Sequence, residues 1–171
     1  MPPTGAPCAS GAVPGNFGAA LEPLDGRDMP DICHALTIKT TPDVVFDAIN
    51  SAEGNRAFWT DQTEYEPQEG TVAVFSFGPN AETQFRFAVE HLDRPKSIAW
   101  KCVGGPPEWV PTSILWTLTP VEGGTHVRFE HKGWESADGE LPACTYTWGL
   151  ILGQLDQFAT TGSAVPPFSV Y

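Results

Sequence analysis

The stretch VRFEHKGW, residues 127–134, places a titratable group where an apolar side chain is expected. Successive side chains of a strand point to opposite faces, so Val127, Phe129 and His131 share one face. A histidine there suits donating a hydrogen bond to a ligand or moving a proton. The alternative is a buried histidine that a backbone carbonyl, a tyrosine or a water satisfies. The sequence leaves both interpretations open.

Aromatic side chains recur at inward-facing positions along the chain. Wide, flat rings can line a space between elements that do not close fully, although the same spacing is typical of an ordinary core. His131 is the polar anchor of the ligand-binding set and the one candidate catalytic residue. We hypothesise that a ligand cavity is lined by Trp59, Phe75, Phe87, Trp100, Cys102, Trp109, Trp116, Phe129, His131, Trp134 and Trp148.

The loop GGPPEW, residues 104–109, is rigid and joins two expected strands, so Glu108 and Trp109 are placed to close a pocket mouth. A turn with its aromatic side chain tucked onto the surface explains the loop equally well. Asp61 and Glu64 are further candidate acids, more typical of solvated positions.

Other chemistry has little support in the sequence. The histidines show no HExxH or Cys/His ligand spacing, and buried cysteine usually behaves as a small hydrophobe, so we expect no metal and no cofactor. GxSxG is absent, and GTVAVFSFG lacks the lysine and the following helix of a phosphate loop.

Residues that could do this chemistry need elements to position them. HALTIKT, residues 34–40, alternates as a strand does. In the following residues Thr41 is a plausible N-cap and Pro42 suits the first position of a short helix. A second short helix is expected to run through residues 57–59.

After Asp61 the apolar period is two, and five segments (71–77, 84–92, 97–103, 113–119 and 125–132) are predicted to be strands. Their short links predict an antiparallel meander with one apolar face. Residues 141–162 supply its cover, because Cys144, Trp148, Ile151, Leu155 and Phe158 form a narrow helical stripe that Gly162 ends.

Composition limits the function classes. A net charge of −12 argues against nucleic acid and against an anionic membrane surface. No apolar run approaches the ~20 residues of a membrane span. The four scattered cysteines and the lack of an export signal predict reduced thiols and a cytoplasmic location. Residues 1–28 are rich in Pro and Gly and are expected to form a flexible extension, followed by a domain at 29–167 and a tail at 168–171.

The order of strand, two short helices, meander and long helix resembles the helix-grip, START-like superfamily, also called SRPBCC. Within it the chain is similar to the branch of chaperone-ATPase-activator homologues. The matching stretches are MPDI (29–32), TTPDVVFDAI (40–49), AEGNRAFWT (52–60), GPPEW (105–109), FEHKGW (129–134) and CTYTWGLILGQL (144–155).

The resemblance implies an α+β fold of about six to seven antiparallel strands curved around a long C-terminal helix, with a cavity between them. It does not choose a function. Our leading hypothesis is a binding protein for a small apolar molecule with one polar end. The alternatives are a cyclase, dehydratase or hydratase that uses His131 as general acid/base, and a chaperone-interacting module. A homodimer also stays open.

Overall fold

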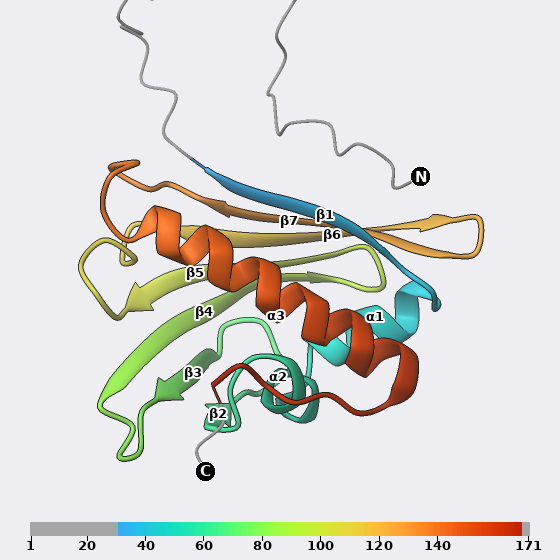
Figure 1. Ribbon diagram of the computed structural model, residues 1–171, viewed down its shortest axis with the longest axis horizontal. Helices are drawn as coiled ribbons and strands as arrows, with labels where there is room; N and C mark the ends of the chain where they lie inside the picture. The colour runs from blue at the N-terminus through green and yellow to red at the C-terminus, as the bar shows by residue number, and fades with distance from the viewer. Residues whose placement is uncertain (1–30, 169–171) are drawn as a thin grey trace, which may run out of the picture.

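The computed structural model describes residues 31–168. Segments of alternating apolar and polar residues form one seven-stranded antiparallel sheet (Figure 1). The strand order is β1-β7-β6-β5-β4-β3-β2, so the first strand pairs with the last. The strands are β1 (Ile32–Ile38), β2 (Thr63–Glu64), β3 (Val72–Phe77), β4 (Thr83–Asp93), β5 (Ser97–Gly104), β6 (Ser113–Val121) and β7 (Gly124–Lys132).

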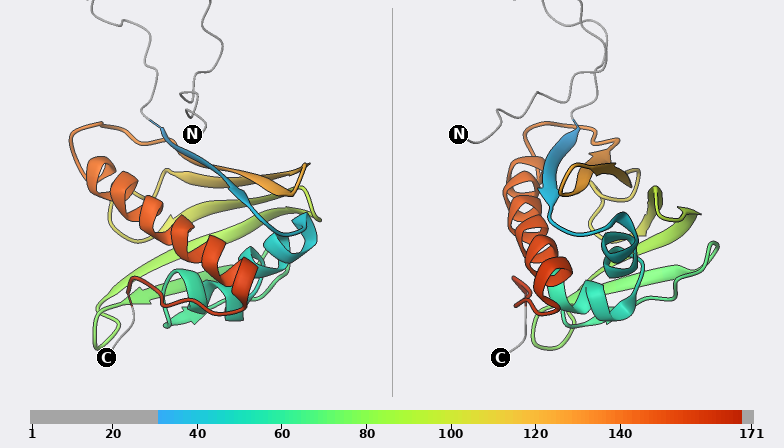
Figure 2. Two further views of the ribbon diagram at one scale, coloured as in Figure 1. Left: turned by 45° about the vertical axis from the view of Figure 1, so that its right-hand side comes forward. Right: turned by 90° about the vertical axis from the view of Figure 1, so that its right-hand side faces the viewer.

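Three helices complete the described part of the chain. The helices are α1 (Pro42–Ile49), α2 (Ala52–Phe58) and α3 (Leu141–Thr161). Pro42 begins α1 as predicted, and Gly162 ends α3 in the left-handed conformation with φ of 76°. Figure 2 shows α3 lying across the inner side of the curved sheet, with α1 and α2 beside its C-terminal half. The predicted α+β helix-grip fold is confirmed.

The predicted inward face of the sheet is also the buried one. Phe87, Trp100, Trp116 and Phe129 are fully buried in successive strands, and Trp148 of α3 packs on Trp116 and Phe129. The ring centroids of Phe129 and Trp148 lie 4.4 Å apart. The middle of the groove between sheet and helix is therefore filled by aromatic side chains, and any cavity must lie toward one end of it.

The sequence predicted an extension before the domain and a tail after it. The expected flexible extension, residues 1–28, lies outside the described residues. After Gly162 the chain turns back along α3, where the N–H of Val165 donates to Oε1 of Gln154 at 3.2 Å (Figure 1). Phe168, which the sequence analysis assigns to the tail, lies edge-on to Phe77 with ring centroids 5.2 Å apart. The C-terminal segment therefore packs against the sheet as far as Phe168.

Candidate functional site: an aromatic pocket at the start of the long helix

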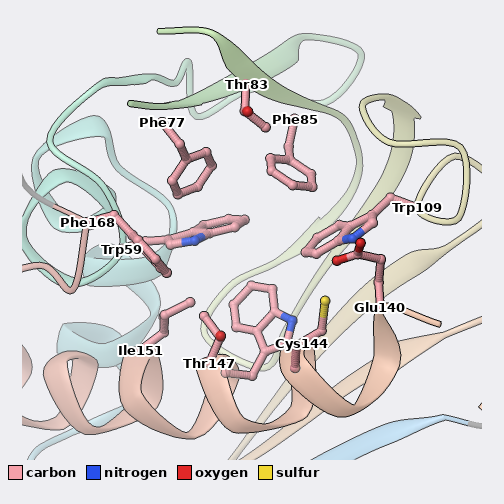
Figure 3. A pocket seen from close by; sticks show the side chains of 12 residues that line it. Trp59, Phe77, Thr83, Phe85, Trp109, Glu140, Cys144, Thr147, Ile151 and Phe168 are labelled. Atoms are coloured by element: carbon pink, nitrogen blue, oxygen red, sulfur yellow. The ribbon is translucent and has the colours of Figure 1, made fainter. Parts of the chain in front are cut away.

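A cavity of about 270 Å³ opens between the first three turns of α3 and the β3–β4 end of the sheet (Figure 3). The loop between β5 and β6 and the C-terminal segment complete its walls. Six of the lining side chains are aromatic. The lining residues are Trp59, Phe77, Thr83, Phe85, Trp109, Glu140, Ala143, Cys144, Thr147, Trp148, Ile151 and Phe168.

The structure brings three of the proposed ligand-binding residues to this cavity: Trp59, Trp109 and Trp148. The others do not line it and lie buried in the core or beside it. These residues are Phe75, Phe87, Trp100, Cys102, Trp116, Phe129, His131 and Trp134. They support the pocket from behind, as Phe75 does by stacking on Trp59 at 4.0 Å between ring centroids.

Several lining residues that were not among the proposed ligand-binding residues lie at inward-facing positions of the strand or helix pattern. Phe77 and Phe85 fall on the inward face of their strands, because Phe75 pairs with Phe85 and Phe77 pairs with Thr83. Cys144 and Ile151 belong to the predicted stripe of α3. Glu140, Ala143 and Thr147 lie beside that stripe, and no pattern in the sequence distinguishes them or Phe168.

His131 is fully buried, and both of its ring nitrogens have partners inside the protein. The indole Nε1–H of Trp148 donates to Nδ1 at 3.1 Å, so Nδ1 must be the acceptor. Thr112 uses its hydroxyl hydrogen on the carbonyl of Trp109 at 2.6 Å, and its oxygen accepts from Nε2–H of His131 at 2.8 Å. Burial lowers the pKa of His131 to about 3. The ring is thus neutral, and it has no nitrogen free for a ligand.

The GGPPEW loop reaches the start of α3, where Trp109 lines the pocket and Glu108 does not. The carboxylate of Glu108 accepts the backbone N–H of Glu140 at 2.8 Å. A side chain at Gly139 would collide with that carboxylate, so the glycine leaves room for it. Glu108 therefore supplies the cap that Glu140, the N-cap residue, does not provide with its own side chain.

Polar groups gather at the same end of the pocket. Trp109 is 6% exposed, and its indole Nε1–H has no hydrogen-bond partner of good geometry among the described residues. Burial raises the pKa of the Cys144 thiol to about 12; the charge of Glu140 adds to this, and a weak hydrogen bond from Trp109 opposes it. The thiol is therefore a poor nucleophile. Trp109 and Glu140 both act on the Cys144 thiol, and all three residues line the pocket.

The remaining candidates do not form a second site. Among residues 31–168 no group of three or more His, Cys, Asp and Glu side chains could hold a metal ion. Asp61 and Glu64 do not line the pocket, and both are exposed.

The cysteines depart from the expected state at one position. Cys33 is disulfide-bonded, so the prediction of a reduced thiol is wrong there. Cys102 and Cys144 are free and buried, as predicted. Burial also raises the pKa of the Cys102 thiol.

No helix within residues 31–168 has the length and apolar character needed to cross a bilayer.

A curved antiparallel sheet around a long C-terminal helix, with an aromatic cavity beneath the first turns of that helix, defines a helix-grip protein. Residues 39–160 match the family described as Activator of Hsp90 ATPase homolog 1-like protein. The chain belongs to this family, which agrees with the branch that the sequence motifs indicated. No curated protein matches the chain.

Solved structures agree with the fold. The solution structure of the Aha1 dimer from Colwellia psychrerythraea is 27% identical, with a TM-score of 0.71 over 78% of this chain and 98% of that one. A Staphylococcus saprophyticus protein is 18% identical, with a TM-score of 0.67 over 82% of this chain and 98% of that one. A protein of the dynemicin biosynthetic locus is 17% identical, with a TM-score of 0.67, and the match covers 82% of this chain and 51% of that one.

Proposed function

We propose that this protein binds a small, mainly apolar, ring-containing molecule in the pocket at the start of α3. The observation that carries the proposal is a cavity with six aromatic side chains in its walls. Apolar concave sites with a few convergent polar groups are the usual design of ligand pockets. The match to the Activator of Hsp90 ATPase homolog 1-like family is compatible with such a pocket and does not name its occupant.

The volume limits the ligand. Benzene fills an engineered cavity of roughly 150 Å³, so a cavity of about 270 Å³ has room for one to two fused rings. A sterol or a long acyl chain is too large to be enclosed. The occupant that fits best is a bicyclic molecule held between the indoles of Trp59, Trp109 and Trp148.

The sequence also left open an enzyme, a chaperone-interacting module and a homodimer. The enzyme hypothesis depended on His131, whose two nitrogens are engaged in the core behind the pocket. These two hydrogen bonds favour a positioning role for His131 over a catalytic one. The family description, Activator of Hsp90 ATPase homolog 1-like protein, suggests a chaperone partner, and the Aha1 dimer from Colwellia psychrerythraea suggests a homodimer.

The test is NMR titration of ¹⁵N-labelled protein with naphthalene, observed at the indole Nε1–H groups. We expect the largest shifts at Trp59, Trp109 and Trp148, because their rings line the cavity, and small shifts at Trp100 and Trp116, which are buried away from it. The core indoles therefore serve as an internal control.

A pair of variants decides whether the cavity is the site. Thr147→Phe places a ring inside the cavity and should abolish naphthalene binding. Thr160→Phe makes the same change at an exposed position near the end of α3 and should leave binding intact. Equal binding by both variants, or no shift in the unsubstituted protein, would refute the proposal.

A further inference from the structure

The polar end of the pocket offers one donor and one acceptor. The donor is the Nε1–H of Trp109, which is buried and has no partner of good geometry within residues 31–168. The acceptor is the carboxylate of Glu140, which lines the same cavity. Figure 3 shows the indole nitrogen of Trp109, the carboxylate of Glu140 and the sulfur of Cys144 on one side of the pocket. A buried donor without a partner costs free energy that a ligand acceptor would recover.

An anionic ligand fits this end poorly. The start of α3 would ordinarily attract an anion, but the carboxylate of Glu108 already occupies the backbone N–H of Glu140. Glu140 adds a second negative charge, and in the part of the chain that the structure describes no Lys, Arg or His lines the cavity. A ligand carboxylate would satisfy Trp109 and meet repulsion from both glutamates.

A cationic ligand satisfies only half of the site. An ammonium group would pair with Glu140, but it has no lone pair to accept from Trp109. A hydroxyl group does both, because its hydrogen can go to Glu140 while its oxygen accepts from Nε1–H. An ether oxygen accepts from Trp109 and leaves Glu140 without a donor.

We propose that the ligand is a neutral bicyclic molecule whose ring hydroxyl lies between the indole Nε1–H of Trp109 and the carboxylate of Glu140. This inference rests on the proposed function, since it names the class of molecule that the same pocket selects. The aromatic walls hold the rings, and the hydroxyl sets their orientation, with the hydroxyl-bearing ring toward the start of α3.

The test compares five probes of one size by calorimetry at pH 7: naphthalene, 2-methoxynaphthalene, 2-naphthol, 2-(aminomethyl)naphthalene and 2-naphthoate. We expect 2-naphthol to bind most tightly. Its advantage over 2-methoxynaphthalene should be roughly tenfold, because hydrogen bonds to charged groups exceed neutral ones. Naphthoate should be the weakest probe.

Two substitutions assign the preference to the named groups. Glu140→Ala should reduce the advantage of 2-naphthol over 2-methoxynaphthalene to about 1 and should strengthen naphthoate binding. Glu135→Ala, at an exposed position outside the pocket, is the matched control and should change neither. Trp109→Phe removes the donor together with part of one wall, so it should weaken 2-naphthol and 2-methoxynaphthalene by roughly 2- to 10-fold more than it weakens naphthalene.

The outcomes separate this inference from the proposed function. If no probe binds in the cavity, the proposed function fails and the inference fails with it. If naphthalene binds while naphthoate or the amine equals 2-naphthol, only the inference is overturned. The same holds if Glu140→Ala leaves the order of the probes unchanged.

Discussion

His131 is held as a neutral ring by hydrogen bonds in series. Trp148 donates to His131, His131 donates to Thr112, and Thr112 donates to the carbonyl of Trp109. Two of these residues, Trp109 and Trp148, line the pocket. The histidine therefore fixes the loop between β5 and β6 and one face of α3 relative to each other. Its place at the end of an apolar row is explained by this link, which ties two walls of the site to β7.

The buried histidine predicts how stability depends on pH. Its pKa is about 3 in the folded protein, against about 6.5 in an unfolded chain. Between these values the unfolded chain binds the proton and the folded protein does not. The free energy of unfolding should therefore fall as the pH drops from about 6.5 toward 3, by up to about 1.4 kcal/mol for each pH unit from this group.

His131→Gln is the variant for this measurement. Glutamine keeps an acceptor for Trp148 and a donor for Thr112 but does not titrate. Urea unfolding of both proteins at pH 7, 6, 5 and 4 should show a steeper loss for the unsubstituted protein. Parallel curves would mean that His131 does not control the acid response.

Among the secondary-structure elements, α2 has the tightest constraint. A Cβ at Gly54 would collide with the backbone carbonyl of Ala48 in α1. This close approach sets the angle at which α2 leaves α1, and Trp59 follows α2 directly into the pocket. A helix that is short and poor in buried apolar residues is positioned here by backbone contact.

Two glycine substitutions test that constraint. Gly54→Ala should destabilise the protein by about 2 kcal/mol or more, because the backbone of α1 would have to move. Gly153→Ala, in α3, meets nothing within 4 Å and should stabilise by about 0.5–1 kcal/mol through the helix preference of alanine. Chemical unfolding of both variants measures the sign of each change in the free energy of unfolding. Equal effects would contradict the close contact between Gly54 and Ala48.

The elements that the sequence predicted well have a single buried face. Trp116, Phe129 and their neighbours alternate along long strands, so the period identifies both the strand and its inward side. Strand β2, Thr63–Glu64, is too short to show any period and was missed. For α3 the stripe of buried residues was found. Thr147 was not, because a period identifies a buried face without showing whether the space opposite it is filled.

At the scale of the whole molecule, the sequence pattern also does not show which buried aromatic residues line the cavity. Trp116 and Trp109 are both inward-facing indoles, yet Trp116 packs 4.7 Å from Phe129 in the core while Trp109 lines the cavity. The difference depends on how far α3 stands from the sheet at each end. Such differences depend on long-range contacts, of which the pairing of β1 with β7, with Leu36 opposite Val127, is an example, and a local period does not encode them.

The segment that follows α3 contributes one aromatic side chain to the wall of the pocket. Gly162 turns the backbone, and Phe168 then forms part of the outer wall while remaining 38% exposed. It is the most exposed of the six aromatic lining residues, since Trp59, Trp109 and Trp148 are buried and Phe77 and Phe85 are half-buried. A ligand that leaves the cavity on this side must displace the Phe168 ring.

Phe168→Ala should therefore act on ligand release more than on folding. Removing the ring takes away about 1 kcal/mol of apolar contact with a bound bicyclic molecule, so the dissociation rate of naphthalene should rise roughly fivefold with little change in association. Val165→Ala, in the same segment but outside the pocket and 60% exposed, is the control. NMR line-shape analysis at the Trp59 indole gives both rates. An unchanged dissociation rate would place the exit elsewhere, between the β5–β6 loop and the start of α3, where the contact of Glu108 with the Glu140 backbone would be the next barrier to test.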